Sequence, residues 1–245
     1  MRLSTLILAF GFLLTPIIGC KSKDAPQRNT EATPEATPQA ATSLAVPAEP
    51  ATSPANDTKR QSWPIIVCFG DSLTAGYGTE PGESYPDALQ LDLDAAGYKY
   101  RVVNQGVSGD TTKDGLQRVD DVIALKPSII VVEFGGNDGL RGIPISASRA
   151  NLDAILAKLK PTGARIALAG MTLPPQYGAD YIKQFGETYT ILAKKYNLPL
   201  LPFLLQDVYG QPGMIQPDGI HATAKGNIAV AKNVLHLLQP LLKKP

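Results

Sequence analysis

The fold of this chain is decided by the stretch IIVCFGDSL, residues 65–73. Its first half is a short apolar run, which is typical of a strand buried on both faces of a parallel sheet. The small and polar residues that follow put the Ser72 hydroxyl at the carboxyl end of that strand, the edge where open α/β sheets bind ligands. Ser72 is therefore a candidate nucleophile. A simpler interpretation is that Asp71 and Ser72 only cap the next helix, because Asp and Ser are common N-cap residues.

Strands and helices are expected to alternate after this point. The hydrophobic patterns predict strands over residues 65–69, 100–103, 128–134, 164–171 and 199–201, and helices over 85–96, 113–124, 146–159, 179–196 and 222–242. Strands separated by helices form right-handed βαβ units and a parallel sheet covered on both faces. The fold class is therefore α/β, a three-layer α/β/α sandwich, in a single domain over residues 63–245.

The N-terminal residues 1–20 are expected to be a targeting signal. Arg2 is followed by a mostly apolar stretch, residues 3–18, that is shorter than the roughly 20 residues of a membrane-spanning helix. The stretch ends in IIGC, residues 17–20, which resembles a bacterial lipobox with Cys20 as the lipidated residue. We therefore expect an exported bacterial lipoprotein, tethered to the membrane and facing the periplasm. An ordinary secretory signal or a short anchor is the alternative.

Residues 21–62 differ in composition from the rest of the chain. They are rich in Pro, Ala, Thr and Glu, and they contain the repeat EATPEATP at 31–38. Such a segment buries too little apolar surface to offset its conformational entropy, so it is interpreted as a disordered tether. The formal net charge of the whole chain is +1, which gives no electrostatic footprint for nucleic acid.

Cysteine and histidine are scarce. With Cys20 lipidated, Cys68 has no cysteine to pair with, and its place in an apolar strand favours a small buried hydrophobe and a poor nucleophile. The two histidines are His221 and His236. His236 belongs to the apolar run of the last helix and is interpreted as a helix-face residue. A histidine-based metal site is not expected, and neither is a cofactor.

His221 is the histidine best suited to activate Ser72. A serine hydroxyl needs a base within hydrogen-bonding reach, and imidazole titrates near neutral pH. Asp218 lies three residues earlier, where its carboxylate can reach Nδ1 and stabilise the imidazolium, and Gly219 permits the tight turn between them.

Two other loops at predicted strand ends carry candidate donors for an oxyanion. They are NQGVSGD at residues 104–110 and GGNDG at 135–139, the second of which is an ordinary turn sequence when taken alone. The candidates are the N–H groups of Ser72 and Gly109 and the side-chain amide of Asn137. Asp71 has no assigned chemistry beyond support of its loop.

Together these blocks carry a family resemblance. Residues 70–73, Gly109, residues 136–138 and residues 218–221 look like the four motifs of the SGNH (GDSL) hydrolases, and the likeness extends from about residue 65 to 241. It is greatest to the periplasmic multifunctional acyl-CoA thioesterases, arylesterases and lysophospholipases. It implies a flavodoxin-like, five-stranded parallel sheet.

The resemblance also implies roles for the site residues. Ser72 is the nucleophile, His221 the base and Asp218 the third member of the triad, while Gly109 and Asn137 complete the oxyanion hole with the Ser72 amide. Two features depart from the usual pattern. The chain is expected to be lipid-tethered, whereas members of that enzyme group are usually soluble in the periplasm. Its loops 78–84 and 173–180 differ too much from those of the family for a substrate to be inferred from the resemblance.

The function expected from these observations is that of a serine esterase acting on carboxylic esters and thioesters, with lysophospholipids among the candidate substrates. A carbohydrate esterase that removes acetyl groups from surface glycans would carry the same motifs. A non-catalytic lipoprotein that binds lipid or glycan through a degenerate site is the alternative from another class. The serine motif is not Gly-x-Ser-x-Gly and opens the domain, which argues against an α/β-hydrolase.

Overall fold

The structure is a computed structural model that describes residues 60–243. The expected signal segment (residues 1–20), the lipidation site Cys20 and residues 21–59 of the expected tether lie outside the described residues. Within residues 60–243, none of the helices has the length and apolar character needed to cross a membrane.

The sheet consists of five parallel strands in the order β2-β1-β3-β4-β5. This is the flavodoxin-like order, which confirms the predicted class. The strands are β1 (Ile65–Gly70), β2 (Arg101–Gly106), β3 (Ile129–Glu133), β4 (Arg165–Ala169) and β5 (Leu200–Leu201). Because β1 lies between β2 and β3, its residues 66–70 are fully buried, as the uninterrupted apolar run predicts.

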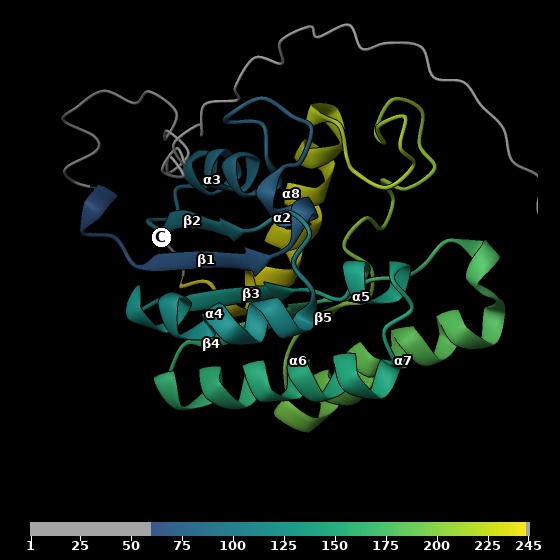
Figure 1. The fold of residues 1–245 in the computed structure, drawn as a ribbon. Coiled ribbons are helices and arrows are strands. Elements are labelled where there is room, and N and C mark those ends of the chain that lie inside the picture. Colours follow the sequence, from purple (N-terminus) through teal and green to yellow (C-terminus); the bar gives the residue numbers. More distant parts are fainter. Residues whose placement is uncertain (1–59, 244–245) are drawn as a thin grey trace, which may run out of the picture. The chain divides into compact units, whose positions relative to one another are not determined.

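Helices cover both faces of this sheet (Figure 1). On one face α3 packs against α8, and on the other α4 packs against α6, which in turn contacts α7. The helices are α2 (Ser72–Ala75), α3 (Tyr85–Ala95), α4 (Thr112–Ala124), α5 (Gly136–Leu140), α6 (Ile145–Leu159), α7 (Ala179–Tyr196) and α8 (Ala224–Leu238), with 3₁₀ turns η1 (Lys160–Thr162), η2 (Pro175–Tyr177) and η3 (Gln239–Leu241). The three-layer α/β/α prediction is confirmed.

Several boundaries differ from the sequence-based expectation, among them the end of β4, which lies at Ala169 and not at residue 171. Strand β2 continues to Gly106, so residues 104–106 pair with β1 instead of forming a loop. Residues 136–140 form the short helix α5 and not a simple turn. The last helix begins after its cap Thr223 and gives way to a 3₁₀ turn at Gln239, because Pro240 lacks the N–H that would continue an α-helix.

Cys68 is completely buried in β1 and is a free cysteine within the part of the chain that the structure describes. Desolvation raises the pKa of its thiol to about 12, so the thiolate that a nucleophile requires is not available at neutral pH. The prediction of a buried cysteine is confirmed.

Candidate active site

Ser72 is the first residue of α2, directly after the turn that ends β1. The cap of this helix is Asp71, whose Oδ1 accepts a hydrogen bond from the Leu73 N–H at 3.1 Å. The turn is so tight that a Cβ on Gly70 would lie 2.7 Å from the Glu133 carbonyl oxygen, so only glycine fits there. The two interpretations of this segment are therefore compatible, because Asp71 caps α2 while Ser72 presents the hydroxyl.

The structure brings together the three residues that the sequence suggested as a triad. The His221 Nε2 lies 2.8 Å from the Ser72 Oγ, and the His221 Nδ1 lies 2.6 Å from the Asp218 Oδ2. The other Asp218 oxygen accepts the backbone N–H groups of Ile220 and His221, at 2.9 and 3.1 Å. Gly219 between them has φ +73°, in the left-handed region that glycine adopts without strain.

These contacts set the charge of Asp218. Partial burial acts to raise the pKa of this carboxyl, but the hydrogen bonds from the Ile220 N–H and from His221 outweigh burial and lower the pKa below its ordinary value of 3.8. The carboxylate is therefore charged at neutral pH, the state in which it can stabilise a protonated imidazole.

Two residues at the histidine loop were not identified from the sequence. The Tyr77 ring lies 4.6 Å from the His221 imidazole, and the Tyr77 side chain is 54% exposed. The Gln216 Nε2 donates to the carbonyl oxygens of Tyr77 at 2.7 Å and Ala222 at 2.8 Å, which joins the nucleophile segment to the histidine loop. No local pattern links positions so far apart in the chain.

Asn137 faces the same site from α5. Its Nδ2 donates to the Asp110 carbonyl oxygen at 2.9 Å and to the Asp71 Oδ2 at 3.2 Å. An amide nitrogen has two hydrogens, so an oxyanion would take over the longer contact to Asp71. The next residue, Asp138, is buried and accepts both the N–H and the hydroxyl of Thr112, at 2.8 and 2.6 Å, which ties α5 to the start of α4.

Gly109 lines the pocket beside Ser72 and has φ +88°. The Arg141 Nη2 donates to its carbonyl oxygen at 2.9 Å, so the loop is held from the end of α5. The three expected oxyanion donors, on Ser72, Gly109 and Asn137, thus belong to residues that line one pocket. Asp71, which had no assigned role beyond loop support, holds both the α2 cap and the Asn137 amide.

A pair of buried carboxyl groups lies beneath the nucleophile turn. Glu133 has no exposed surface, and its Oε2 accepts the Thr74 hydroxyl at 2.8 Å and the Asp71 N–H at 3.4 Å. Among residues 60–243, no group forms a hydrogen bond with its Oε1. Desolvation, together with the neighbouring charge of Asp71, raises the pKa of Glu133 well above 4.5, and desolvation likewise raises the pKa of Asp71 to about 7.

Glu133→Gln is expected to weaken the pH dependence of stability. A raised pKa means that the folded state holds a proton that the unfolded chain releases, so stability is greatest in acid and falls as pH rises. The contribution of Asp71 to stability falls between pH 3.8 and about pH 7, and the contribution of Glu133 begins to fall near pH 4.5. The variant keeps the acceptor for Thr74 without a charge, so we expect it to exceed the wild type in unfolding free energy by at least about 1 kcal/mol near pH 8.

Urea unfolding between about pH 4 and pH 8 measures this difference, with the two proteins converging at the acid end. The exposed Glu187→Gln serves as the control and should follow the wild type throughout. An unchanged slope in Glu133→Gln would contradict a buried, protonated Glu133.

The pocket beside Ser72 has a volume of about 320 Å³. Its polar groups are concentrated at the triad and the oxyanion donors, and the remaining wall is mainly apolar. The apolar lining comes from Leu73, Tyr77, Leu140, Met171, Leu173, Pro174, Phe203, Tyr209 and Ile220. A cavity of this kind suits an apolar group next to one polar reacting centre.

Comparison with known proteins agrees with this geometry. Residues 68–228 match the sequence profile described as the GDSL-like Lipase/Acylhydrolase family. The chain belongs to this family. It is a GDSL-type serine hydrolase, and its five-stranded parallel sheet is the fold of the solved SGNH hydrolases.

Proteins similar to this GDSL hydrolase include a named esterase and a named thioesterase. The chain is 39% identical to Esterase TesA of Pseudomonas aeruginosa, over 76% of this chain and 92% of that protein. It is 37% identical to Thioesterase 1/protease 1/lysophospholipase L1 of Escherichia coli strain K12, over 72% of this chain and 84% of that protein. Among solved structures, AlinE4, an SGNH-hydrolase family esterase, is 42% identical, with a TM-score of 0.62 over 74% of this chain and 98% of that one.

Proposed function

We propose that this GDSL hydrolase cleaves carboxylic esters and thioesters with a Ser72–His221–Asp218 triad. The observation that carries the proposal is the continuous contact from the Ser72 Oγ through the imidazole to the Asp218 carboxylate, at 2.8 and 2.6 Å, beside an apolar pocket. Such an arrangement activates a serine whose hydroxyl is otherwise a weak nucleophile.

The reaction follows from the positions of these groups. The His221 Nε2 takes the Ser72 proton while Oγ attacks the carbonyl carbon, and Asp218 stabilises the imidazolium. The N–H groups of Ser72 and Gly109 and the Asn137 amide receive the negative oxygen. The imidazolium then protonates the leaving alcohol or thiol, which leaves an acyl group on Ser72. Water, deprotonated by His221, attacks that ester and releases the acid.

The substrates best suited to the pocket are acyl esters and thioesters with an apolar acyl chain. The mainly apolar wall supports this choice, and so do the names of the similar esterase and thioesterase. Lysophospholipids carry the same kind of acyl ester and are included in the proposal. A carbohydrate O-acetyl esterase is disfavoured, because a sugar would need polar groups along that wall. A non-catalytic binding protein would have no need of a charged Asp218 hydrogen-bonded to the imidazole.

A series of p-nitrophenyl esters from acetate to palmitate, with one acyl thioester and one lysophospholipid, tests the proposal. We expect kcat/KM to rise from acetate to chains of intermediate length, since each buried CH₂ contributes about 0.8 kcal/mol until the pocket is filled. A preference for acetate, with no hydrolysis of longer chains, would favour the carbohydrate esterase instead. Failure of a fluorophosphonate probe to label the protein would reject serine catalysis altogether.

The N-terminal sequence supports a membrane-tethered, periplasmic location for this activity. We propose that Cys20 is lipidated after export and tethers the catalytic domain to a membrane on its periplasmic side, through residues 21–62. Metabolic labelling with an alkyne fatty acid tests this. Label should appear on the wild type and be absent from Cys20→Ala, and equal labelling of the two would reject the proposal.

A further inference from the structure

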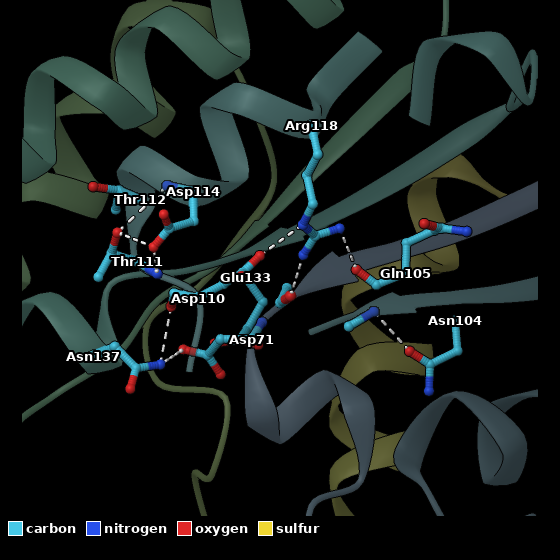
Figure 2. A network of polar contacts seen from close by, with 12 residues as sticks. Asp71, Asn104, Gln105, Asp110, Thr111, Thr112, Asp114, Arg118, Glu133 and Asn137 are labelled. Atoms are coloured by element: carbon cyan, nitrogen blue, oxygen red, sulfur yellow. Dashed lines mark hydrogen bonds and ion pairs between the residues drawn. The ribbon is translucent and has the colours of Figure 1, made fainter. Parts of the chain in front are cut away.

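Arg118 is placed to connect the segments that carry the three oxyanion donors. It lies on α4, and its guanidinium donates three hydrogen bonds (Figure 2). The Nη2 donates to the Gly70 carbonyl oxygen at 2.8 Å, the Nη1 to the Gln105 carbonyl oxygen at 2.9 Å, and the Nε to the Asp110 Oδ2 at 2.6 Å.

The three acceptors lie next to the proposed donors. Gly70 ends β1, two residues before Ser72, and Gln105 lies near the end of β2, on the way to Gly109. Asp110 follows Gly109 directly, and its carbonyl oxygen accepts the Asn137 amide at 2.9 Å. A single side chain therefore sets the spacing between the nucleophile turn, the Gly109 loop and, through Asp110, Asn137.

The sequence of α4 explains why the guanidinium reaches this place. The capping box of Thr111 and Asp114 starts the helix directly after Asp110. Arg118 lies about two turns further on, and helical side chains lean back toward the N-terminus, so its head group returns to the loop. The head group is also packed on the rings of Phe69, at 4.7 Å, and Phe134, at 5.5 Å, which limits its movement.

We propose that Arg118 is a positioning residue that holds the oxyanion donors of Ser72, Gly109 and Asn137 in their catalytic arrangement. The inference rests on the proposed function, because the donors are assigned there. Oxyanion stabilisation depends on donors that are fixed before the charge develops, and a displacement of about 1 Å is enough to impair it. Lysine cannot replace Arg118, since an ammonium group has no planar fork to reach three acceptors and no flat face to stack between two rings.

The test compares Arg118→Lys with Arg165→Lys on a p-nitrophenyl ester. Arg165 is a matched control because it is also half-buried and donates to a backbone carbonyl, that of Leu241, but it is the first residue of β4, at the amino end of the parallel strands and away from their carboxyl ends, where Ser72 lies. We expect kcat of Arg118→Lys to fall about 10- to 100-fold with KM changed by less than about twofold, because only the transition state carries the oxyanion. Arg165→Lys should keep the wild-type kcat even if its melting temperature falls.

Asn137→Ala, alone and combined with Arg118→Lys, separates positioning from general loss of structure. If both residues act on the same oxyanion, the combined loss in kcat should be clearly smaller than the product of the single losses. Three results would each overturn the inference about Arg118 alone. They are a combined loss in kcat equal to the product of the two single losses, a change in KM with kcat unaffected, and equal losses of kcat in Arg118→Lys and Arg165→Lys. A wild-type kcat in Asn137→Ala would overturn the oxyanion assignment itself, and the role of Arg118 with it.

Asp110→Asn provides a second route if Arg118→Lys does not fold. It removes the charge that pairs with Nε and retains the backbone carbonyl that accepts Asn137. We expect kcat to fall about three- to tenfold with KM unchanged, because the two contacts of Arg118 with backbone carbonyls remain and its Nε contact loses the opposite charge. An unchanged kcat in Asp110→Asn would count against the inference.

Discussion

Ser72→Ala is expected to lower kcat for a p-nitrophenyl ester by about 10⁴- to 10⁶-fold. The variant lacks the oxygen that forms the acyl bond, and the remaining groups can only bind the ester and polarise its carbonyl. The fold should be preserved, because the α2 cap comes from Asp71 and the hydroxyl is hydrogen-bonded only to His221 among the described contacts of residues 60–243. Steady-state hydrolysis after removal of contaminating esterases measures the effect.

The control for Ser72→Ala is binding without turnover. An uncharged ether analogue of the substrate should bind the variant as it binds the wild type, and the melting temperature should stay within a few degrees of the wild-type value, as for most changes that leave packing intact. Hydrolysis at more than a tenth of the wild-type rate would mean that another group is the nucleophile.

Asp218→Asn is expected to lower kcat by about 10³- to 10⁴-fold. In the wild type, the carboxylate accepts three hydrogen bonds, two from backbone N–H groups and one from the His221 Nδ1 at 2.6 Å. Asparagine can still accept the backbone bonds with its oxygen, but its NH₂ group then faces Nδ1. The imidazole is driven to the tautomer that carries its proton on Nε2, where it cannot accept the Ser72 proton.

Asp120→Asn is a suitable control for this charge change. Asp120 is an exposed carboxylate that pairs with Lys158 at 2.8 Å on the surface of α4, so kcat should not change. Covalent labelling by a fluorophosphonate gives a second check. Asp218→Asn should still be labelled, at a greatly reduced rate, whereas Ser72→Ala should not be labelled at all. A kcat of Asp218→Asn within tenfold of the wild type would exclude Asp218 from the triad.

Local hydrophobic patterns in the sequence predict much of the fold. The apolar run at residues 65–69 predicted a buried strand, and the structure has it between two parallel neighbours. The apolar periodicity of residues 146–159 and 179–196 gave helices that agree with α6 and α7 to within one residue. Boundaries were less well predicted where competing backbone hydrogen bonds decide them, as at residues 104–106, which are recruited into β2 by pairing with β1.

The candidate site also contains residues that could be predicted from the sequence and residues that could not. Ser72, His221 and Asp218 could be proposed from their chemistry, because few residues can activate a serine and the chain offers two histidines. Tyr77 and Arg118 could not, because a tyrosine near a serine motif and an arginine on a helix face are ordinary residues. Their significance depends on the rings and carbonyl oxygens that the fold brings to them.

The sequence by itself therefore determined the class of fold and the candidates for nucleophile and base, since residue type, strand-end position and hydrophobic period are properties of short segments. Only the tertiary structure decided how these groups are held. The buried Asp71 and Glu133, the Asn137 amide between Asp71 and Asp110, and the Arg118 guanidinium each depend on partners that are tens of residues distant. The pKa values of Asp71 and Glu133 and the donor positions of Asn137 and Arg118 follow from burial and distance in space, which no spacing along the chain encodes.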